Sequence, residues 1–153
     1  MIHTLTLRKA NLADAETVAE IYLVSRKAFV SFAPLIHSDA SIHEWVCKTL
    51  IPGSDVIVAE QSSQIVGMMA LSKQNGIGWV DQLYLAPPVT GQGIGTQLLA
   101  YAKRALGAPI RLHTFQENSG ARRFYERHGF QVLELSDGSG NEERCPDILY
   151  EWN

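Results

Sequence analysis

Three glycines stand at alternate positions in the segment VTGQGIGTQLL (89–99), which leads directly into an apolar, helix-like run. Gly91, Gly93 and Gly95 are costly there, because glycine loses more backbone freedom on folding than any other residue. Without side chains, however, the backbone can bend sharply and direct its N–H groups at phosphate oxygens. The N-terminus of the following helix adds a partial positive charge. The segment therefore predicts a phosphate-binding loop at a strand-to-helix junction, with a flexible turn that binds nothing as the alternative.

The spacing of these glycines excludes the two most common phosphate-binding loops. The dinucleotide fingerprint G-x-G-x-x-G would place its third glycine at Thr96 or at Leu98, depending on which glycine begins it. The P-loop ends in Gly-Lys-Ser/Thr, and this segment contains no lysine. The loop is therefore of another kind.

The histidines and cysteines do not indicate a metal site. HEWVC (43–47) begins like the helical motif of zinc proteases, but its last position is Cys47 instead of histidine. A capping box formed by Ser41 and Glu44 explains the glutamate better. Cys47 and Cys145 lie far apart and fit no metal-ligand pattern, so we expect free thiols in a reducing compartment. We predict that the protein binds no metal.

The composition is that of an ordinary globular protein. The chain has 153 residues, of which 46% are hydrophobic and 19% charged, and we expect a single domain over 1–153. The beginning of the chain lacks the apolar core of a signal peptide, and no apolar run has transmembrane length. We therefore expect a cytoplasmic protein without a membrane partner. A net charge of −3, without a basic stripe that contains aromatic residues, argues against binding to nucleic acid.

Hydrophobic periodicity predicts a mixed sheet with helices on both faces. The elements follow in the order β-α-α-β-β-β-α-β-α-β-β. The expected strands are 3–8, 55–60, 64–71, 77–85, 109–115, 130–135 and 147–152. The expected helices are 11–29, capped by Asn11 or Asp14, a short one from 41, one from the glycines to 106, and 119–128.

A second segment makes the family recognisable. NSGARRFYERHGF (118–130) follows a strand that ends in LHTFQE (112–117). Together with LYLAPPVTGQGIGTQLL (83–99), in this order and spacing, it resembles the GNAT superfamily of acyl-CoA-dependent N-acyltransferases. The resemblance covers nearly the whole chain. It implies a GNAT fold of α/β (α+β mixed) class, with a mostly antiparallel sheet of about seven strands, four helices and acetyl-CoA as co-substrate. The family usually has Arg or Gln where Thr90 stands, so one side-chain contact to the phosphates is expected to be missing.

The resemblance also implies which residues bind coenzyme A. The N–H groups of the glycine loop would bind the pyrophosphate, and arginines within 101–127 would attract the phosphates. The backbone of Leu83 and Leu85 would contact the thioester carbonyl and the pantetheine arm, and both side chains can be core residues as well. Asn118 would hold the pantetheine arm or cap its helix. The predicted cofactor-binding residues are Leu83, Leu85, Gly91, Gln92, Gly93, Ile94, Gly95, Thr96, Asn118 and Tyr125.

For catalysis, the resemblance implies transfer of the acetyl group to a primary amine by direct attack in a ternary complex. Tyr125 matches the family's tyrosine beside the sulfur, where a phenol can protonate the leaving thiolate. The alternative is a tyrosine that only packs against the sheet. Asp81 is the candidate general base, because the strand before the glycine loop contains no glutamate. Asp81 could instead be a turn residue or a cross-strand partner, and His113 is a rival base.

The acceptor is the least defined part of the prediction. In this fold the loop before the last strand borders the acceptor site, where Glu142, Glu143 and Asp147 would attract a cationic amine of a small molecule or a peptide. The alternative is a solvated acidic loop. A non-catalytic acyl-CoA-binding sensor is the second candidate function, although Tyr125 favours an enzyme because a sensor needs no acid at the sulfur. The oligomeric state is left open, with a homodimer as one arrangement.

Overall fold

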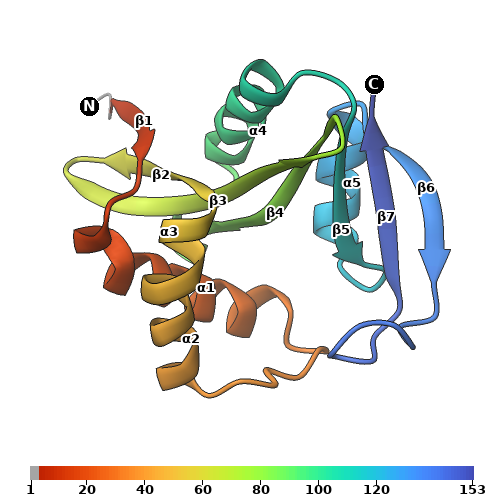
Figure 1. The fold of residues 1–153 in the computed structure, drawn as a ribbon, viewed down its shortest axis with the longest axis horizontal. Coiled ribbons are helices and arrows are strands. Elements are labelled where there is room, and N and C mark those ends of the chain that lie inside the picture. The colour runs from red at the N-terminus through yellow and green to blue at the C-terminus, as the bar shows by residue number, and fades with distance from the viewer. Residues whose placement is uncertain (1–3) are drawn as a thin grey trace.

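The computed structural model describes residues 4–153, which form one seven-stranded sheet with helices on both faces (Figure 1). The spatial order is β1-β2-β3-β4-β5-β7-β6, and in this part of the chain only the β4–β5 pair is parallel. The strands are β1 (Leu5–Lys9), β2 (Asp55–Gln61), β3 (Gln64–Gln74), β4 (Ile77–Leu85), β5 (Ile110–Phe115), β6 (Gln131–Ser136) and β7 (Asp147–Trp152). The predicted fold class and element order are confirmed, and the part of the first predicted strand at residue 3 lies outside the described residues.

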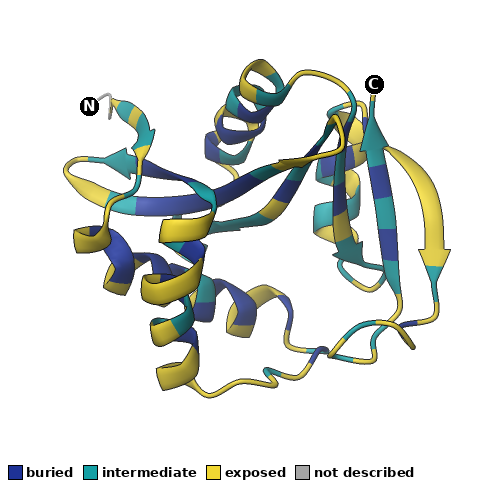
Figure 2. Ribbon diagram, in the orientation of Figure 1, coloured by how far each residue is buried: buried dark blue, intermediate teal, exposed yellow. Residues whose placement is uncertain are grey.

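The helices cover the two faces of the sheet separately. The buried residues form two clusters, one on each face of the sheet. One cluster includes Val18, Val46 and Met68, and the other includes Leu98 and Tyr125. Figure 2 shows the buried residues along the sheet and on the helix faces that point toward it. One face carries α1 (Ala15–Phe29) and α2 (Asp39–Trp45), and α2 continues through a π-helical turn (Val46–Leu50) into α3 (Ile51–Gly53). The other face carries α4 (Ile94–Leu106) and α5 (Ser119–Arg127). Among the helices of residues 4–153, none has the length and apolar character to cross a membrane.

The capping prediction is confirmed for the first helical segment and wrong for the second. The Asn11 side chain accepts a hydrogen bond from the N–H of Ala13 at 2.9 Å, and Asp14 accepts one from the N–H of Asn11 at 2.9 Å. Helix α2 begins before Ser41, because the hydroxyl of Ser38 accepts the N–H of Ser41 at 3.1 Å and caps the helix one turn earlier. Glu44 instead forms an ion pair with Lys48, one turn further on.

Strands β4 and β5 separate soon after they meet. Their pairing is confined to Gly78 with Ile110 and Trp79 with Arg111, although β4 continues to Leu85. On its other side, β5 pairs with β7 along its whole length. The second half of β4 therefore presents backbone groups toward β5 without a strand partner there.

A β-bulge in β4 gives Asp81 a special position. In the register with β3, Val80 lies opposite Leu71 and Gln82 lies opposite Ala70, so Asp81 is the additional residue. The bulge also shifts the alternation of side chains. Leu83 and Leu85 join Val80 in the core beneath α4 and α5, whereas Tyr84 packs with the core beneath α1. Bulges of this kind redirect side chains and are common beside active sites.

Candidate active site

The glycine loop joins β4 to α4 through two residues in the left-handed region. Gly91 has a φ of 81° and Gly93 a φ of 83°, and a Cβ atom at either position would meet nothing within 4 Å. The backbone conformation, and not packing, therefore favours glycine at both positions. Gly95 is different, because a Cβ atom there would lie 3.2 Å from Cζ of Phe124. The third glycine thus allows α4 and α5 to pack closely.

The N-terminus of α4 has N–H groups without acceptors in the helix. Gly93 occupies the N-cap position and provides no side chain, and the first helical hydrogen bond runs from the N–H of Gln97 to the carbonyl of Gly93 at 3.2 Å. The N–H groups of Ile94, Gly95 and Thr96 precede this bond and therefore can bind an anion. Thr90 uses its hydroxyl within its own turn, donating to the carbonyl of Pro87 at 3.0 Å.

A groove of about 770 Å³ extends from this loop along β4, β5 and α5. Of the ten predicted cofactor-binding residues, eight line it: Leu83, Leu85, Gly91, Gly93, Gly95, Thr96, Asn118 and Tyr125. The side chain of Ile94 is buried in the core and does not line the groove, and that of Gln92 is exposed outside it. These two residues can contribute only their backbone N–H groups.

Basic side chains gather where α5 approaches the start of α4. Arg127 and His128 both line the groove. Nε2 of His128 lies 3.1 Å from the hydroxyl of Thr96, which links the two helices. Burial, Lys103 and Arg127 together lower the pKa of His128. Of the two groove-lining groups, Arg127 therefore provides the more permanent positive charge.

Asn118 and Tyr125 lie on the α5 side of the groove. The side-chain oxygen of Asn118 accepts the N–H of Ala121 at 3.2 Å, so Asn118 does cap α5. Tyr125 is only 8% exposed, and its ring packs against Phe124 and Phe130 at centroid distances of 5.2 and 5.8 Å. Burial raises the pKa of its hydroxyl. No hydrogen bond to this hydroxyl is formed by the residues that the structure describes, although Tyr125 lines the groove.

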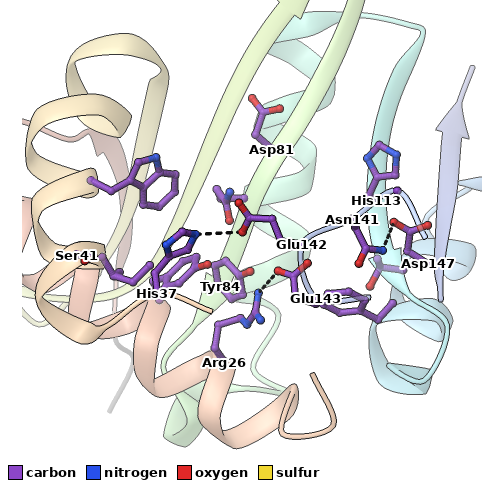
Figure 3. Close-up of a pocket in the computed structure, with 17 residues that line it drawn as sticks. Arg26, His37, Ser41, Asp81, Tyr84, His113, Asn141, Glu142, Glu143 and Asp147 are labelled. Atoms are coloured by element: carbon purple, nitrogen blue, oxygen red, sulfur yellow. Dashed lines mark hydrogen bonds and ion pairs between the residues drawn. The ribbon is translucent and has the colours of Figure 1, made fainter. Parts of the chain in front are cut away.

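A second cleft, of about 610 Å³, opens on the other side of β4, between α1, α2, β5 and the loop 137–146 (Figure 3). It has six lining residues in common with the groove: Asp81, Gln82, Tyr84, His113, Thr114 and Phe115. These residues lie on the parts of β4 and β5 that separate from each other. The groove and the second cleft therefore meet at the gap between the two strands.

Both candidate bases lie at this junction. Asp81 is exposed, but the protein atoms around it still raise the pKa of its carboxyl by desolvation, which a hydrogen bond from Ser72 partly offsets. Within residues 4–153, no basic side chain forms an ion pair with Asp81. His113 is also exposed, and its ring stacks on Trp79 at a centroid distance of 5.6 Å.

The acidic loop packs against the rest of the protein. Glu142 lies 3.1 Å from Nε2 of His37, and Glu143 lies 3.7 Å from Nη1 of Arg26. Asp147 accepts a hydrogen bond from Asn141 at 3.2 Å, and the same amide group donates to the carbonyl of Cys145 at 2.7 Å. The three predicted acceptor-binding carboxylates therefore all line the cleft, and each already has a protein partner (Figure 3).

The sequence patterns do not single out Arg26, Tyr22 or Tyr84, which form the floor of the second cleft. The spacing of Tyr22 and Arg26 could have indicated that they act together, because residues four apart lie on the same face of a helix. For metals, no group of three or more His, Cys, Asp or Glu side chains in the described part of the chain could hold an ion.

Comparison with known proteins identifies the family. The acetyltransferase (GNAT) domain family matches residues 52–132, more than half of the 153-residue chain. An uncharacterized N-acetyltransferase of Methanocaldococcus jannaschii is 26% identical over 151 residues, covering 90% of this chain and 66% of that protein. An aminoalkylphosphonate N-acetyltransferase of Salmonella typhimurium is 37% identical over 97 residues, covering 57% of this chain and 63% of that protein. The chain thus spans about two thirds of the length of both relatives.

A solved structure agrees with these relatives. The PaiA N-acetyltransferase of Thermoplasma acidophilum, in complex with coenzyme A, has a TM-score of 0.79 and 25% identity, covering 98% of this chain and 99% of that one. The comparison of folds and the comparison of sequences thus agree. This chain belongs to the GNAT family of acetyltransferases.

Proposed function

We propose that this protein transfers an acetyl group from acetyl-CoA to the primary amine of a small molecule or a peptide, in a ternary complex. The observation that carries the proposal is the junction of the two clefts between β4 and β5. Acetyl-CoA bound in the groove would bring its thioester to this gap from one side. The amine in the second cleft would reach the thioester from the other side, so that direct attack needs no covalent enzyme intermediate.

The glycine loop is the proposed pyrophosphate site. Its two left-handed glycines leave the N–H groups at the start of α4 accessible, and the related PaiA structure contains coenzyme A. The backbone N–H groups of Leu83 and Leu85 would contact the pantetheine arm and polarise the thioester carbonyl, because this half of β4 has no partner on β5. Asn118 would contribute its amide nitrogen, since its oxygen caps α5.

The proton transfers are assigned to Asp81 and Tyr125. Asp81 would remove a proton from the ammonium group of the acceptor, directly or through water, and the neutral amine would then attack the carbonyl carbon. As the C–S bond breaks, the attacking nitrogen would lose its second proton to water, and the sulfur would take the proton of the Tyr125 hydroxyl and leave as a thiol. The raised pKa of Tyr125 keeps this proton in place over the whole physiological pH range. Solvent would return a proton to Tyr125 after release of coenzyme A.

A cationic acceptor fits the charges of the second cleft. Four carboxylates line it: Glu142 and Glu143 face basic side chains, whereas Asp81 and Asp147 have no basic partner among the described residues. The aminoalkylphosphonate N-acetyltransferase is a relative whose acceptors are small amines by name. A sensor of acyl-CoA would need the groove alone, whereas the second cleft that opens onto the thioester position favours an enzyme. We keep the cytoplasm, where acetyl-CoA is available, as its expected location.

The test combines turnover with binding. Release of coenzyme A from acetyl-CoA is followed with polyamines, amino acids, aminoglycosides and peptides as acceptors, and at least one should be acetylated. In calorimetry, Gly93→Val should weaken acetyl-CoA binding by about 2–3 kcal/mol, or roughly 30- to 150-fold, because it covers charged hydrogen-bonding groups. Unchanged affinity in the folded variant would exclude the loop as the cofactor site.

Gly76→Val is the matched control for this variant. Gly76 also has a left-handed φ, +80°, with nothing within 4 Å of its Cβ position, but it lies in the turn between β3 and β4. The backbone strain of the two substitutions should therefore be similar, about 1–3 kcal/mol. Only the variant at position 93 should lose affinity for acetyl-CoA.

A homodimer remains part of the proposal, with β6 as the contact. This strand lies at the edge of the sheet and exposes the side chains of Val132, Leu133 and Leu135. Edge strands of this kind pair readily with another chain. Light scattering of the wild type and of Leu135→Lys measures the oligomeric state of each, and a monomeric wild type would exclude this arrangement.

A further inference from the structure

The floor of the second cleft contains a buried arginine whose donors are not all used. The side chain of Arg26 is 6% exposed, and it comes from α1 to line the cleft. Its Nε has no hydrogen-bond partner among the described residues. A guanidinium has five N–H donors, and burying it without enough acceptors is strongly unfavourable. Arg26 is therefore incompletely satisfied by the protein alone.

Arg26 has hydrogen-bonding contact with the hydroxyl groups of Tyr84 and Tyr22, and a more distant carboxylate partner. Its carboxylate partner is Glu143, whose Oε1 lies 3.7 Å from Nη1, which is beyond hydrogen-bond distance. The rings of Tyr22 and Phe115 lie 5.9 and 5.8 Å from its Cζ atom, within the range of cation–π contacts. These contacts hold the guanidinium in place but leave capacity for a further oxygen ligand.

Charge within the cleft points in the same direction. Among the described lining residues, Arg26 is the sole lysine or arginine. Asp81 lies on β4 at the top of Figure 3, at the opposite end from Arg26. The cleft thus has a fixed cation, approached by Glu143, at one end and, at the other end, a carboxylate without a basic partner, beside the proposed position of the thioester. A planar guanidinium matches the oxygens of a carboxylate or a phosphonate with two parallel hydrogen bonds.

We propose that Arg26 binds an oxyacid group of the acceptor, so that the acceptor carries an anionic carboxylate or phosphonate as well as its primary amine. The inference rests on the acetyltransferase function proposed above and specifies its substrate class. With the oxyacid on Arg26, the amine points toward Asp81 and the thioester. The acceptor's oxyacid would take over or share the position in which Glu143 now approaches Arg26.

The experiment compares three acceptors that share the same amine end: 2-aminoethylphosphonate, β-alanine and propylamine. Acetyl transfer by the wild type should have a kcat/KM at least tenfold higher for one of the two oxyacids than for propylamine, and the stronger of the two identifies the oxyacid. Arg26→Met keeps an unbranched side chain but removes the guanidinium, and should abolish this preference, mainly through KM of the oxyacid. Arg26→Lys should restore it only in part, since lysine lacks the fork of donors.

A purely structural role of Arg26 has a different signature. If Arg26 only holds the loop through Glu143, then Arg26→Met should lower kcat/KM equally for all three acceptors, and the proposal is wrong. Glu143→Gln keeps the arginine and removes its charged partner, so it should retain or increase the preference for the oxyacid. Loss of the preference in Glu143→Gln would also overturn the proposal, because the loop would then set it.

Direct binding separates this inference from the proposed function. Calorimetry with 2-aminoethylphosphonate and β-alanine, in the presence of coenzyme A, measures the anion site without turnover. If no amine is acetylated but binding depends on Arg26, the anion site stands and the acetyltransferase proposal fails. If neither oxyacid binds to the wild type, or if binding to a folded Arg26→Met variant is unchanged, the anion site is refuted whatever the activity.

Discussion

Tyr125→Phe tests the proton donor at the sulfur with the loss of a single oxygen atom. The structure predicts that this variant folds normally. The ring of Tyr125 packs against Phe124, Phe130 and Tyr150, and phenylalanine retains these contacts. The hydroxyl has no hydrogen-bond partner in residues 4–153. The free energy of unfolding should therefore change by about 1 kcal/mol or less, because no buried partner is left unsatisfied.

The effect on the rate should be much larger. Loss of a general acid typically lowers the rate by ~10²–10⁴, which corresponds to about 3–5 kcal/mol of activation free energy. The assay is release of coenzyme A at saturating acceptor, under conditions in which the chemical step limits turnover. The affinity for acetyl-CoA should be nearly unchanged, since the hydroxyl is a small part of the groove. A thioester with a more acidic thiol should recover much of the lost rate, because its sulfur needs less help to leave.

A control variant and two contrary outcomes complete this test. Tyr101→Phe removes a hydroxyl from α4, outside both clefts, and should leave the rate unchanged. An unaltered kcat in Tyr125→Phe would refute the role of Tyr125 as the acid and leave water as the proton source. A large drop in melting temperature would instead show that the hydroxyl satisfies a structural partner.

Three further predictions concern charged groups. Because desolvation by the surrounding protein raises the pKa of Asp81, the loss of enzyme activity on acidification should have a midpoint above the ordinary aspartate value of 3.8. Asp81→Asn should abolish this acidic limb of the pH–rate profile and lower kcat ~10²-fold or more. A wild-type profile without such a limb would favour the rival imidazole as base. The hydrogen bonds from Arg8 lower the pKa of Asp14, so their stabilisation is complete above pH 3.8 and is lost as the pH falls through the lower pKa of the folded state. Asp14→Ala should cost about 2 kcal/mol in urea unfolding at pH 7 and nearly nothing at the acid end, and a pH-independent difference would contradict this. Glu142→Gln should raise KM for a cationic amine without changing KM for acetyl-CoA. The free energy of unfolding should change by about 1 kcal/mol or less, because the pair of Glu142 with His37 is exposed. An unchanged KM for the amine would restrict the role of Glu142 to that pair.

The order of the elements and most of the groove could be predicted from the sequence, because they depend on local patterns. The glycines at 91 and 93 mark a left-handed turn before α4, and the segment 118–130 carries its own cap and aromatic residues. Eight of the ten predicted cofactor residues consequently line the groove. Ile94 does not, because a helix must also bury one side chain of its first turn, and the motif does not indicate which one.

The second cleft could be predicted only in part, because its contacts join distant segments. Arg26 and Glu143 are separated by most of the chain, and so are His37 and Glu142. Composition shows an acidic loop but not the basic partners that hold it in place. The capping residue of α2 was predicted wrongly for a related reason: Ser38 and Ser41 both offer a hydroxyl, and only the path of the preceding chain decides between them.

The bulge at Asp81 shows why the centre of the site is the part that periodic patterns predict least well. Alternation assigns the side chains of a strand to two faces, and it assumes that every residue has one partner across the ladder. Asp81 has none, so Leu83 and Leu85 change faces relative to a regular strand and line the groove, while Tyr84 packs with the core beneath α1 and also lines the second cleft. The separation from β5 begins at the same place and leaves the backbone of β4 able to bind a ligand. The bulge, which strict alternation of side chains does not predict, is therefore the feature that would give both proposed substrates access to one point.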